Sequence, residues 1–292
     1  MDARRLYPWL IRAVWLVLPF AAGPAFGAGL HPYSEAVRLS GTVLGWVGWA
    51  VVLVGTLVPY PLGLTALRMV APAAVLAAMA AVLTGRPSTL SALGALFTTV
   101  LSVVVAFAPP TGALYVNGPA YPNERRYPLR PPGPLLLGPL QLSWALAVGA
   151  PVAGIVLLAA RAWIVGAAVL VVGVPAAVIL ARSLHSLARR WLVFVPAGVV
   201  LHDPLNLLDP VLFPRQSIET LRAAPAGSDS LDLTKGALGL ALELVLLEKV
   251  PMTLLKPGTR AGQAGASARL LFTPTRPGQV LAEAARRRVP VG

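Results

Sequence analysis

Two long stretches of this chain contain no carboxylate side chain. None lies between Arg38 and Glu124, and none lies between Glu124 and Asp203. Both stretches consist almost entirely of Ala, Val, Leu, Gly and Pro, in a chain that is 57% hydrophobic. An ionised Asp at the centre of a membrane helix costs about 2.5–3.5 kcal/mol. We therefore predict that the first two thirds of the chain lie in a membrane. The last third, which holds most of the carboxylates, is predicted to lie in water.

Six apolar segments approach the length of roughly 20 residues that a membrane-spanning helix needs. The predicted helices cover residues 8–26, 41–62, 64–83, 90–108, 135–160 and 162–180. Pro and Gly at residues 59–63 and 85–88 are typical of tight turns, so neighbouring helices should form antiparallel hairpins. The first segment has an alternative interpretation as a signal peptide, because Arg4 and Arg5 precede it and small residues follow. Arg12 inside the apolar run favours a retained helix.

The arginines are distributed unequally between the two sides that these helices define. With the N-terminus in the cytosol, the cytosolic side holds Arg4, Arg5, Arg12, Arg68, Arg125, Arg126, Arg130, Arg182, Arg189 and Arg190, against Arg38, Arg86 and Arg161 on the other side. Because basic residues accumulate on the cytosolic side, we predict a multi-pass plasma-membrane protein with both termini in the cytosol. Arg12 and Arg68 lie about one turn inside their helices, where a long side chain can reach the headgroups.

Residues 109–134 form the one long connection in the membrane part. Because they contain many prolines, we predict no regular helix there. The arginine distribution places this loop in the cytosol, either packed on the C-terminal domain or lying on the bilayer.

After residue 180 the hydrophobic pattern changes to short β-rich runs, so we divide the chain into a polytopic helical domain (1–188) and a cytosolic domain (189–292). Predicted strands cover residues 191–195, 199–202, 211–213, 218–223, 230–233, 251–255 and 268–273. Residues 196–198 signal a hairpin, and residues 235–236 a turn. The apolar run 238–247 fits a strand or a helix. The Gly/Ala-rich residues 258–267 are predicted to be a mobile linker.

A helix is predicted over residues 277–288, with Thr275 as its cap. Helical spacing groups four apolar side chains, which we expect to pack on the sheet: Val280, Leu281, Ala284 and Ala285.

The C-terminal third resembles the bacterial pleckstrin-homology-like (bPH-type) domain. The resemblance spans residues 190–288 and rests on the segments RWLVFVPAGVVLHDP, PVLFPRQSIETL and LDLTKGALGLALELVLL and on the closing helix. It implies a bent β-sheet capped by a helix, and a role in binding or assembly. Asp-Pro pairs at 203–204 and 209–210 depart from a simple hairpin meander and leave the strand number open. Arg-dominated basic residues with abundant Ala, Gly and Pro are typical of a GC-rich bacterial genome.

No set of residues converges on a catalytic, cofactor or metal site. The chain has no cysteine, and its three histidines, His31, His185 and His202, are far apart in sequence. His202 and Asp203 are adjacent on a strand and so point to opposite faces. Glu243 is expected on the solvent face of a strand. Gly-rich nucleotide motifs are absent, and much of the net charge of +13 lies at the ends of apolar segments, which argues against nucleic-acid binding.

We therefore predict a non-enzymatic scaffold or regulator without a cofactor. Besides the bilayer, its expected partners are anionic phospholipid headgroups, and a protein partner or a second copy of the chain. The candidate contact residues are Arg189, Arg190, Arg286, Arg287 and Arg288. An alternative explanation of these arginines is topology signalling and charge complementarity with a helix end. The alternative function is a small-solute transporter or channel subunit that uses proline-kinked membrane helices. A lipid-modifying enzyme is the least favoured class.

Overall fold

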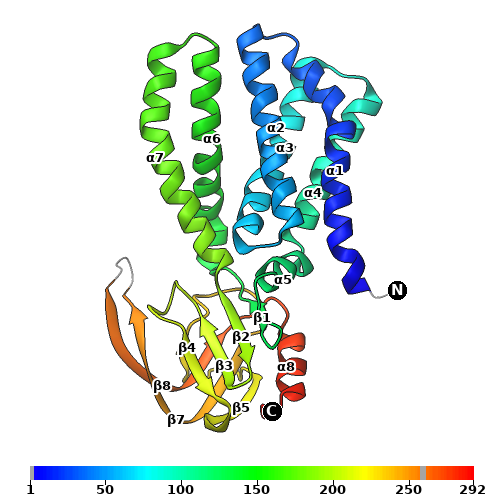
Figure 1. The fold of residues 1–292 in the computed structure, drawn as a ribbon. Helices are drawn as coiled ribbons and strands as arrows, with labels where there is room; N and C mark the ends of the chain where they lie inside the picture. The colour runs from blue at the N-terminus through cyan, green and yellow to red at the C-terminus, as the bar shows by residue number, and fades with distance from the viewer. Residues whose placement is uncertain (1–2, 257–260) are drawn as a thin grey trace. The chain divides into compact units, whose positions relative to one another are not determined.

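The computed structural model describes residues 3–256 and 261–292, which form two compact units. The first comprises Met1–Gly118 and Gln141–His185 and is helical. The second comprises Pro119–Leu140 and Ser186–Gly292 and is rich in β-strands. Figure 1 shows the order of the elements. Residues 119–140, which we had assigned to the membrane domain, thus belong to the β-rich unit, because a strand within them pairs there.

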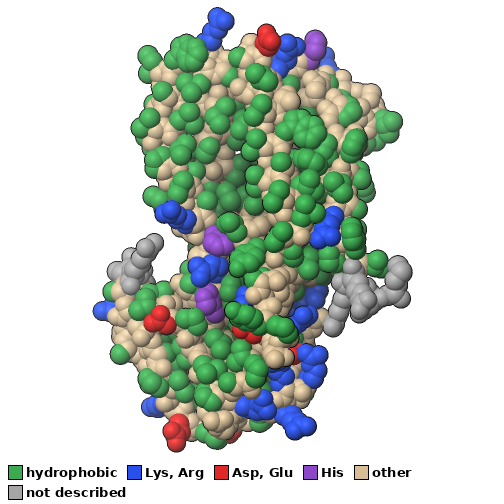
Figure 2. Space-filling view, viewed as in Figure 1, with side chains coloured by type: hydrophobic (Ala, Val, Ile, Leu, Met, Phe, Trp, Pro, Cys, Tyr) green, Lys and Arg blue, Asp and Glu red, His purple; other side chains and the backbone are tan. Residues whose placement is uncertain are grey.

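The helical unit contains six helices that are long and apolar enough to cross a membrane, as predicted. They are α1 (Ala3–Leu30), α2 (Glu35–Leu57), α3 (Pro61–Gly85), α4 (Thr89–Phe107), α6 (Pro139–Ala159) and α7 (Trp163–Ala188). Ser34 and Ser88 cap α2 and α4 by accepting backbone N–H bonds. The visible face of this unit is almost wholly hydrophobic, with charged side chains near its ends (Figure 2). Such a surface suits lipid rather than water.

Proline does not interrupt the membrane helices. Pro19, Pro72, Pro151 and Pro175 lie inside α1, α3, α6 and α7, which all continue through them. In a membrane bundle, neighbouring groups and small local adjustments satisfy the carbonyl that each proline frees. The unwound segments that a solute site would use are therefore not seen at these four positions.

Residues 109–134 are more regular than we predicted. Pro109 and Pro110 occupy the first positions of α5 (Pro109–Asn117), where a missing N–H costs no intrahelical bond. Strand β1 (Arg125–Pro128) and a 3-10 helix, η1 (Gly133–Leu137), follow. The absence of helix was therefore a wrong prediction, because proline disfavours a helix interior but favours a helix start.

The β-rich unit consists of two four-stranded sheets. The first, in the order β1-β2-β3-β4, is antiparallel and adds β2 (Trp191–Val195), β3 (Gly198–His202) and β4 (Val211–Pro214) to β1. A short 3-10 helix, η2 (Arg215–Ser217), leads to the second sheet. That sheet has the order β5-β7-β8-β6 and contains β5 (Ile218–Ala223), β6 (Leu231–Asp232), β7 (Leu242–Leu255) and β8 (Gly262–Phe272).

The predicted hairpin over residues 191–202 is confirmed, with Trp191 paired with His202 and Val195 with Gly198. Gly198 has a φ of 155°, and a Cβ there would lie 2.1 Å from the carbonyl oxygen of Phe213. Only glycine fits this position.

Strands β7 and β8 differ from the prediction. Residues 242–247 of the apolar run and the predicted strand 251–255 are parts of one strand, β7, whereas residues 238–241 precede it. The register of β7 with β8 shifts between Val245 and Val250. Residues 262–267 belong to β8 and are not a linker, whereas residues 258–260 lie outside the described part of the chain. Pairing between the two strands, which a local pattern does not reveal, holds this Gly/Ala-rich segment extended.

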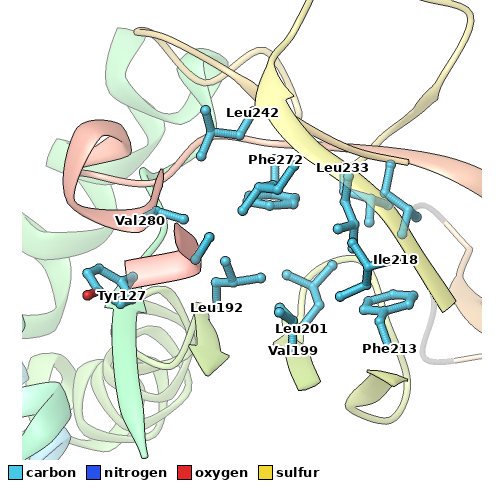
Figure 3. Close-up of a cluster of buried hydrophobic side chains, with 14 of the residues drawn as sticks. Tyr127, Leu192, Val199, Leu201, Phe213, Ile218, Leu233, Leu242, Phe272 and Val280 are labelled. Atoms are coloured by element: carbon cyan, nitrogen blue, oxygen red, sulfur yellow. The ribbon is translucent and has the colours of Figure 1, made fainter. Parts of the chain in front are cut away.

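A hydrophobic core lies within the β-rich unit and draws on both sheets (Figure 3). Alternate residues of β7 enter it, namely Leu242, Leu244 and Leu246. This period of two explains why the apolar run forms a strand rather than a helix. From outside residues 186–292, Tyr127 and Leu129 also enter the core.

The C-terminal helix α8 (Pro277–Arg286) covers part of this core, mainly through Val280 and Ala284. Leu281 is half-buried against the core, but Ala285 is exposed, contrary to our prediction. Thr275 is not the cap either. Its N–H donates to Pro128, and Arg276 takes the cap position without a side-chain bond.

Candidate functional site

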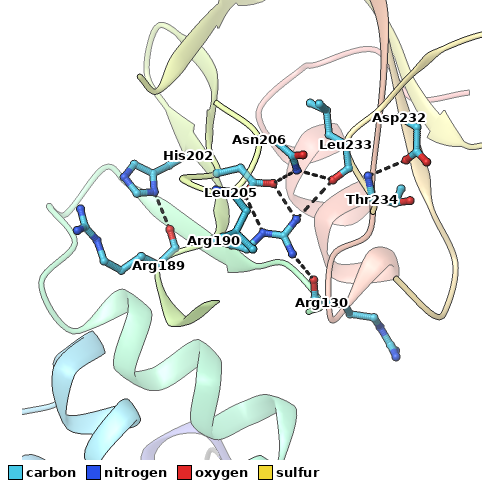
Figure 4. Close-up of polar contacts among 10 residues, drawn as sticks. Arg130, Arg189, Arg190, His202, Leu205, Asn206, Asp232, Leu233 and Thr234 are labelled. Carbon is cyan, nitrogen blue, oxygen red and sulfur yellow. Dashed lines mark hydrogen bonds and ion pairs between the residues drawn. The ribbon is translucent and has the colours of Figure 1, made fainter. Parts of the chain in front are cut away.

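Arg190 lies in the interior of the β-rich unit, not on its surface (Figure 4). Its Nε and Nη2 donate to the two carboxylate oxygens of Asp203 at 2.7 and 2.8 Å. Its Nη1 donates to the carbonyl of Arg130 at 2.8 Å. Asn206 donates to the same carboxylate and to the carbonyl of Leu233. Because only 2% of its surface is exposed, the Arg190 side chain is not accessible to a lipid headgroup in this structure. It forms a buried ion pair with Asp203 instead.

His202 and Asp203 point into separate environments, as expected of neighbours on a strand. The His202 ring stacks on Trp191, with 4.8 Å between ring centroids, and its Nδ1 lies 2.6 Å from the carbonyl oxygen of Arg189. Burial lowers the pKa of His202, and the bond to that carbonyl acts in the opposite direction. The guanidinium of Arg126 covers the Trp191 ring at 5.5 Å. The two side chains thus have different partners and are not hydrogen-bonded to each other.

Glu243 is buried, although its alternation along β7 points it away from the core. Ser228 and Ser230 donate to one carboxylate oxygen at 2.5 and 2.6 Å, and Arg222 donates to the other at 2.8 Å. Burial alone would raise the pKa of Glu243, but these bonds and the charge of Arg222 outweigh it and lower the pKa to about 2. The predicted solvent exposure of Glu243 is therefore wrong, because the segment carrying the two serines covers this face.

The terminal arginines surround one carboxylate. Arg286 and Arg287 both pair with Glu283, which is 5% exposed, at helical spacings of three and four residues. Arg287 also donates to the carbonyl of Asn123 at 2.9 Å. Burial raises the pKa of Glu283, but the bonds from the two arginines outweigh it, so the net shift is downward. Arg288 follows the helix with a φ of 57° and is exposed.

A group of cationic side chains remains at the surface near this end of α8. Arg286 is 69% exposed, and Arg125 and Arg288 are exposed too. The bond from Arg287 to Asn123 places the segment just before β1 next to the end of α8, and the charges of Arg125 and Arg286 both act on the pKa of Tyr127. We call Arg125, Arg286 and Arg288 the basic surface. The fifth candidate, Arg189, is exposed but lies in the turn between α7 and β2, and we do not include it in this surface.

In the helical unit, Arg12 and Arg68 bind the ends of neighbouring helices. Arg12 donates to the carbonyls of Thr56 and Leu57 at the end of α2, and Arg68 donates to the carbonyl of Ala106 near the end of α4. These bonds complement the partial negative charge at a helix C-terminus. We predicted that both side chains reach the lipid headgroups; in the structure both donate hydrogen bonds to backbone carbonyls of the protein.

Within residues 3–256 and 261–292, no group of His, Asp and Glu side chains is placed to hold a metal ion. A shallow apolar groove runs along one face of α4, lined by Leu96, Phe97, Val100, Leu101 and Val104.

Comparison with known proteins finds no matching family model, no matching curated protein and no matching solved structure.

Sequence reasoning missed the Arg190–Asp203 pair and the role of Glu283. A signal for each was present. Glu283 precedes Arg286 and Arg287 by three and four residues, the spacing of helix-surface ion pairs. Continuing the hairpin register by one residue beyond Trp191 and His202 places Arg190 opposite Asp203.

Proposed function

We propose that this polytopic membrane protein is a non-enzymatic scaffold or regulator whose β-rich unit has a pleckstrin-homology-like fold and contacts an anionic surface. Two small sheets and a closing helix, α8, support the PH-like assignment. Binding modules of this kind act through an exposed surface. The function therefore depends on which exposed charged side chains of the unit have no ion-pair partner within it.

The basic surface is the observation that carries this proposal. Arg286 is already paired with Glu283, whereas none of the described carboxylates forms an ion pair with Arg125 or Arg288. The surface therefore keeps a net positive charge close to the helix end. Near an anionic leaflet each such arginine contributes about 1 kcal/mol of attraction. The three buried carboxylates that the structure describes, Asp203, Glu243 and Glu283, are all bonded to arginine, which supports a structural rather than a catalytic use.

Vesicle capture tests this surface. The full chain, held in phosphatidylcholine nanodiscs, should capture phosphatidylglycerol vesicles at low salt and lose most of this capture when Arg125 and Arg288 are both replaced by Gln. This pair leaves the ion pairs of Glu283 intact. Arg215→Gln with Arg269→Gln removes the same charge from exposed positions elsewhere and should have little effect. Equal capture by both double variants would refute the lipid contact. A photo-reactive residue at position 288 would then reveal a protein partner in native membranes.

The proposal also places both termini in the cytosol. If all six candidate helices span the membrane, both chain ends lie on one side, and the arginine distribution selects the cytosol. Because the chain has no cysteine, single cysteines can be labelled without background. A cysteine at the exposed position His31 should react in intact cells, and one at the exposed position Ala226 only after lysis. Labelling of position 226 from outside would reverse the orientation.

A further inference from the structure

The β-rich unit contains the start of a membrane helix. The unit includes residues 119–140, and α6 begins at Pro139. The 21 residues of α6 extend over about 32 Å, close to the thickness of about 30 Å of the hydrocarbon core of a bilayer. Only Gly138 separates Leu137 from Pro139, so Leu137 lies at most about 7 Å from the start of α6. The headgroup layer is about 5–8 Å thick, which places Leu137, 88% exposed within the protein, at the level of the headgroups.

A loop from a distant part of the sequence lies against the segment that leads into α6. Residues 234–241 connect β6 to β7, and we call them the 234–241 loop. A Cβ at Gly133, the first residue of η1, would lie 2.1 Å from the carbonyl oxygen of Gly236. A Cβ at Gly239 would lie 3.0 Å from the guanidinium carbon of Arg130. The loop therefore touches residues 130–133, just before the stretch that carries Leu137.

The buried guanidinium of Arg190 holds the loop and this segment together at their bases (Figure 4). It donates to the carbonyl of Arg130 at 2.8 Å and to that of Leu233 at 3.4 Å. Asn206 also donates to the Leu233 carbonyl, at 2.8 Å. Arg190 itself follows Ala188, the last residue of α7, by two residues. The base of the loop is thus fixed to the segments that connect the β-rich unit to α6 and to α7.

Hydrogen bonds within the loop set its shape and leave its leucines outside. The N–H of Thr234 donates to the carboxylate of Asp232 at 2.7 Å, and the N–H of Gly236 donates to the hydroxyl of Thr234 at 3.2 Å. Gly236 has a φ of 68°, a conformation that glycine adopts without strain. Leu238 is nevertheless 66% exposed, and Leu240 is exposed too. Burial of these two side chains in the β-rich unit is therefore not what holds the loop in place.

The residue types in the loop suit the interface between headgroups and acyl chains. A single exposed leucine is ordinary on a protein surface, but Leu238 and Leu240 follow a segment that chain connectivity brings to the bilayer. Lys235 precedes them; it is exposed and forms no ion pair with any carboxylate that the structure describes. A lysine can keep its ammonium group among the phosphates while neighbouring apolar side chains lie deeper.

We propose that the 234–241 loop contacts the surface of the bilayer that α6 crosses, with Leu238 and Leu240 inserted at the level of the headgroups and the adjoining acyl chains. This contact would hold the β-rich unit in one orientation on its own membrane. It rests on α6 crossing the membrane and not on the basic surface. Because the inserted side chains are apolar, the contact requires no anionic lipid.

Single-cysteine fluorescence on the full chain tests the contact, since the chain has no cysteine of its own. In phosphatidylcholine nanodiscs, a nitrobenzoxadiazole probe at position 238 or 240 should emit at a shorter wavelength than in water. Phosphatidylcholine with a nitroxide near its headgroup should quench it, as it should a probe at position 137. The matched control is Leu247, which is 63% exposed but lies about 16 Å along β7 from Leu242, where the loop ends. A probe there should be quenched by iodide in the buffer and little by the nitroxide lipid.

Substitutions and further outcomes make the test decisive. Leu238→Gln should reduce the nitroxide quenching of a probe at position 240, whereas Leu247→Gln should leave it unchanged. If probes at 238 and 240 match the probe at 247 in emission and in both kinds of quenching, the contact is refuted. Emission at a shorter wavelength without nitroxide quenching refutes it too and indicates a protein partner at the loop. If one labelled variant fails to fold, the other position decides.

The same experiment separates this contact from the proposed function. The nanodiscs contain no anionic lipid, so the quenching at positions 238 and 240 should be the same when Arg125 and Arg288 are both replaced by Gln. Loss of vesicle capture in that double variant tests the basic surface alone. Either proposal can therefore fail while the other stands.

Discussion

Trp15 and Trp49 exchange hydrogen bonds, each indole N–H donating to the backbone carbonyl of the other residue, at 2.8 and 2.9 Å. This reciprocal pair joins α1 to α2 at a point where Trp15 is 2% exposed. Between membrane helices the hydrophobic effect supplies little attraction, so packing and polar contacts of this kind hold the helices together.

Replacing Trp15 by Phe should therefore loosen the bundle. The variant loses one of the two indole donors and leaves the carbonyl of Trp49 without its partner. Interhelical hydrogen bonds contribute about 0.6–2 kcal/mol in membranes, so we expect a Tm lower by several degrees in detergent. Trp163→Phe, at a 62% exposed position on α7, serves as the control and should be nearly neutral. Equal Tm values for the two variants would contradict a stabilising role for the pair.

Arg190→Gln should destabilise the β-rich unit strongly. It leaves Asp203 buried without its cation, and breaking a buried ion pair in this way costs about 3–5 kcal/mol. Limited proteolysis of the full chain measures the effect, with the rate of cleavage within residues 186–292 as the readout. Arg215→Gln at an exposed position should leave the cleavage rate near that of the parent. Resistance of the Arg190 variant to the protease would show that the pair is dispensable.

The β-rich unit should not fold from residues 186–292 alone. That fragment lacks β1, the core residues Tyr127 and Leu129, and the Arg130 carbonyl that accepts from Arg190. Joining residues 119–140 to it through a flexible linker should restore a cooperative thermal transition in circular dichroism. A cooperative transition in the shorter fragment would show that β1 is an accessory strand.

Acid should weaken the Glu243 cluster. The pKa of Glu243 in the folded chain, about 2, lies below the ordinary value of 4.5, so the folded state favours the ionised form. The stabilisation is complete above pH 4.5 and is lost as the pH falls from about 4.5 to about 2. In Glu243→Gln this part of the pH dependence should disappear, with a loss of about 1–3 kcal/mol at neutral pH. Glu219→Gln, at an exposed position, should keep the parent's acid profile in the same proteolysis assay.

A charge on the buried face of α8 should unfold the β-rich unit. Val280 is 0% exposed within the core, so Val280→Asp buries an unpaired carboxylate. Ala285→Asp on the exposed face should be tolerated. Leu281→Asp should fall between them because Leu281 is only partly buried. Similar proteolysis rates for the Val280→Asp and Ala285→Asp variants would contradict the assignment of Val280 to the buried face of α8.

Much of the helical unit could be predicted because its signal is local. Each membrane helix forms its backbone hydrogen bonds within itself and is recognisable in the sequence as a long apolar segment. Helix α1 was therefore predictable despite Arg12 and its prolines. Most of the local β elements, such as the hairpin from Trp191 to His202 and strand β5, were likewise predictable, since their residues are close in sequence.

The rest depended on partners distant in sequence. Residues 125–128 form a strand because they pair with β2, which lies more than sixty residues later in the sequence. The Gly/Ala-rich residues of β8 are extended because β7 pairs with them. No local pattern shows that Ser228 and Ser230 bond Glu243, or that Tyr115 of α5 is buried against Gly63 of α3. The sequence alone determined which segments avoid water, because hydrophobicity belongs to each segment. Only the tertiary structure decided which arginines bind internal carboxylates and carbonyls, such as Arg190, and which remain exposed without an ion pair, such as Arg288. The reason is that an ion pair depends on two residues that the fold brings together.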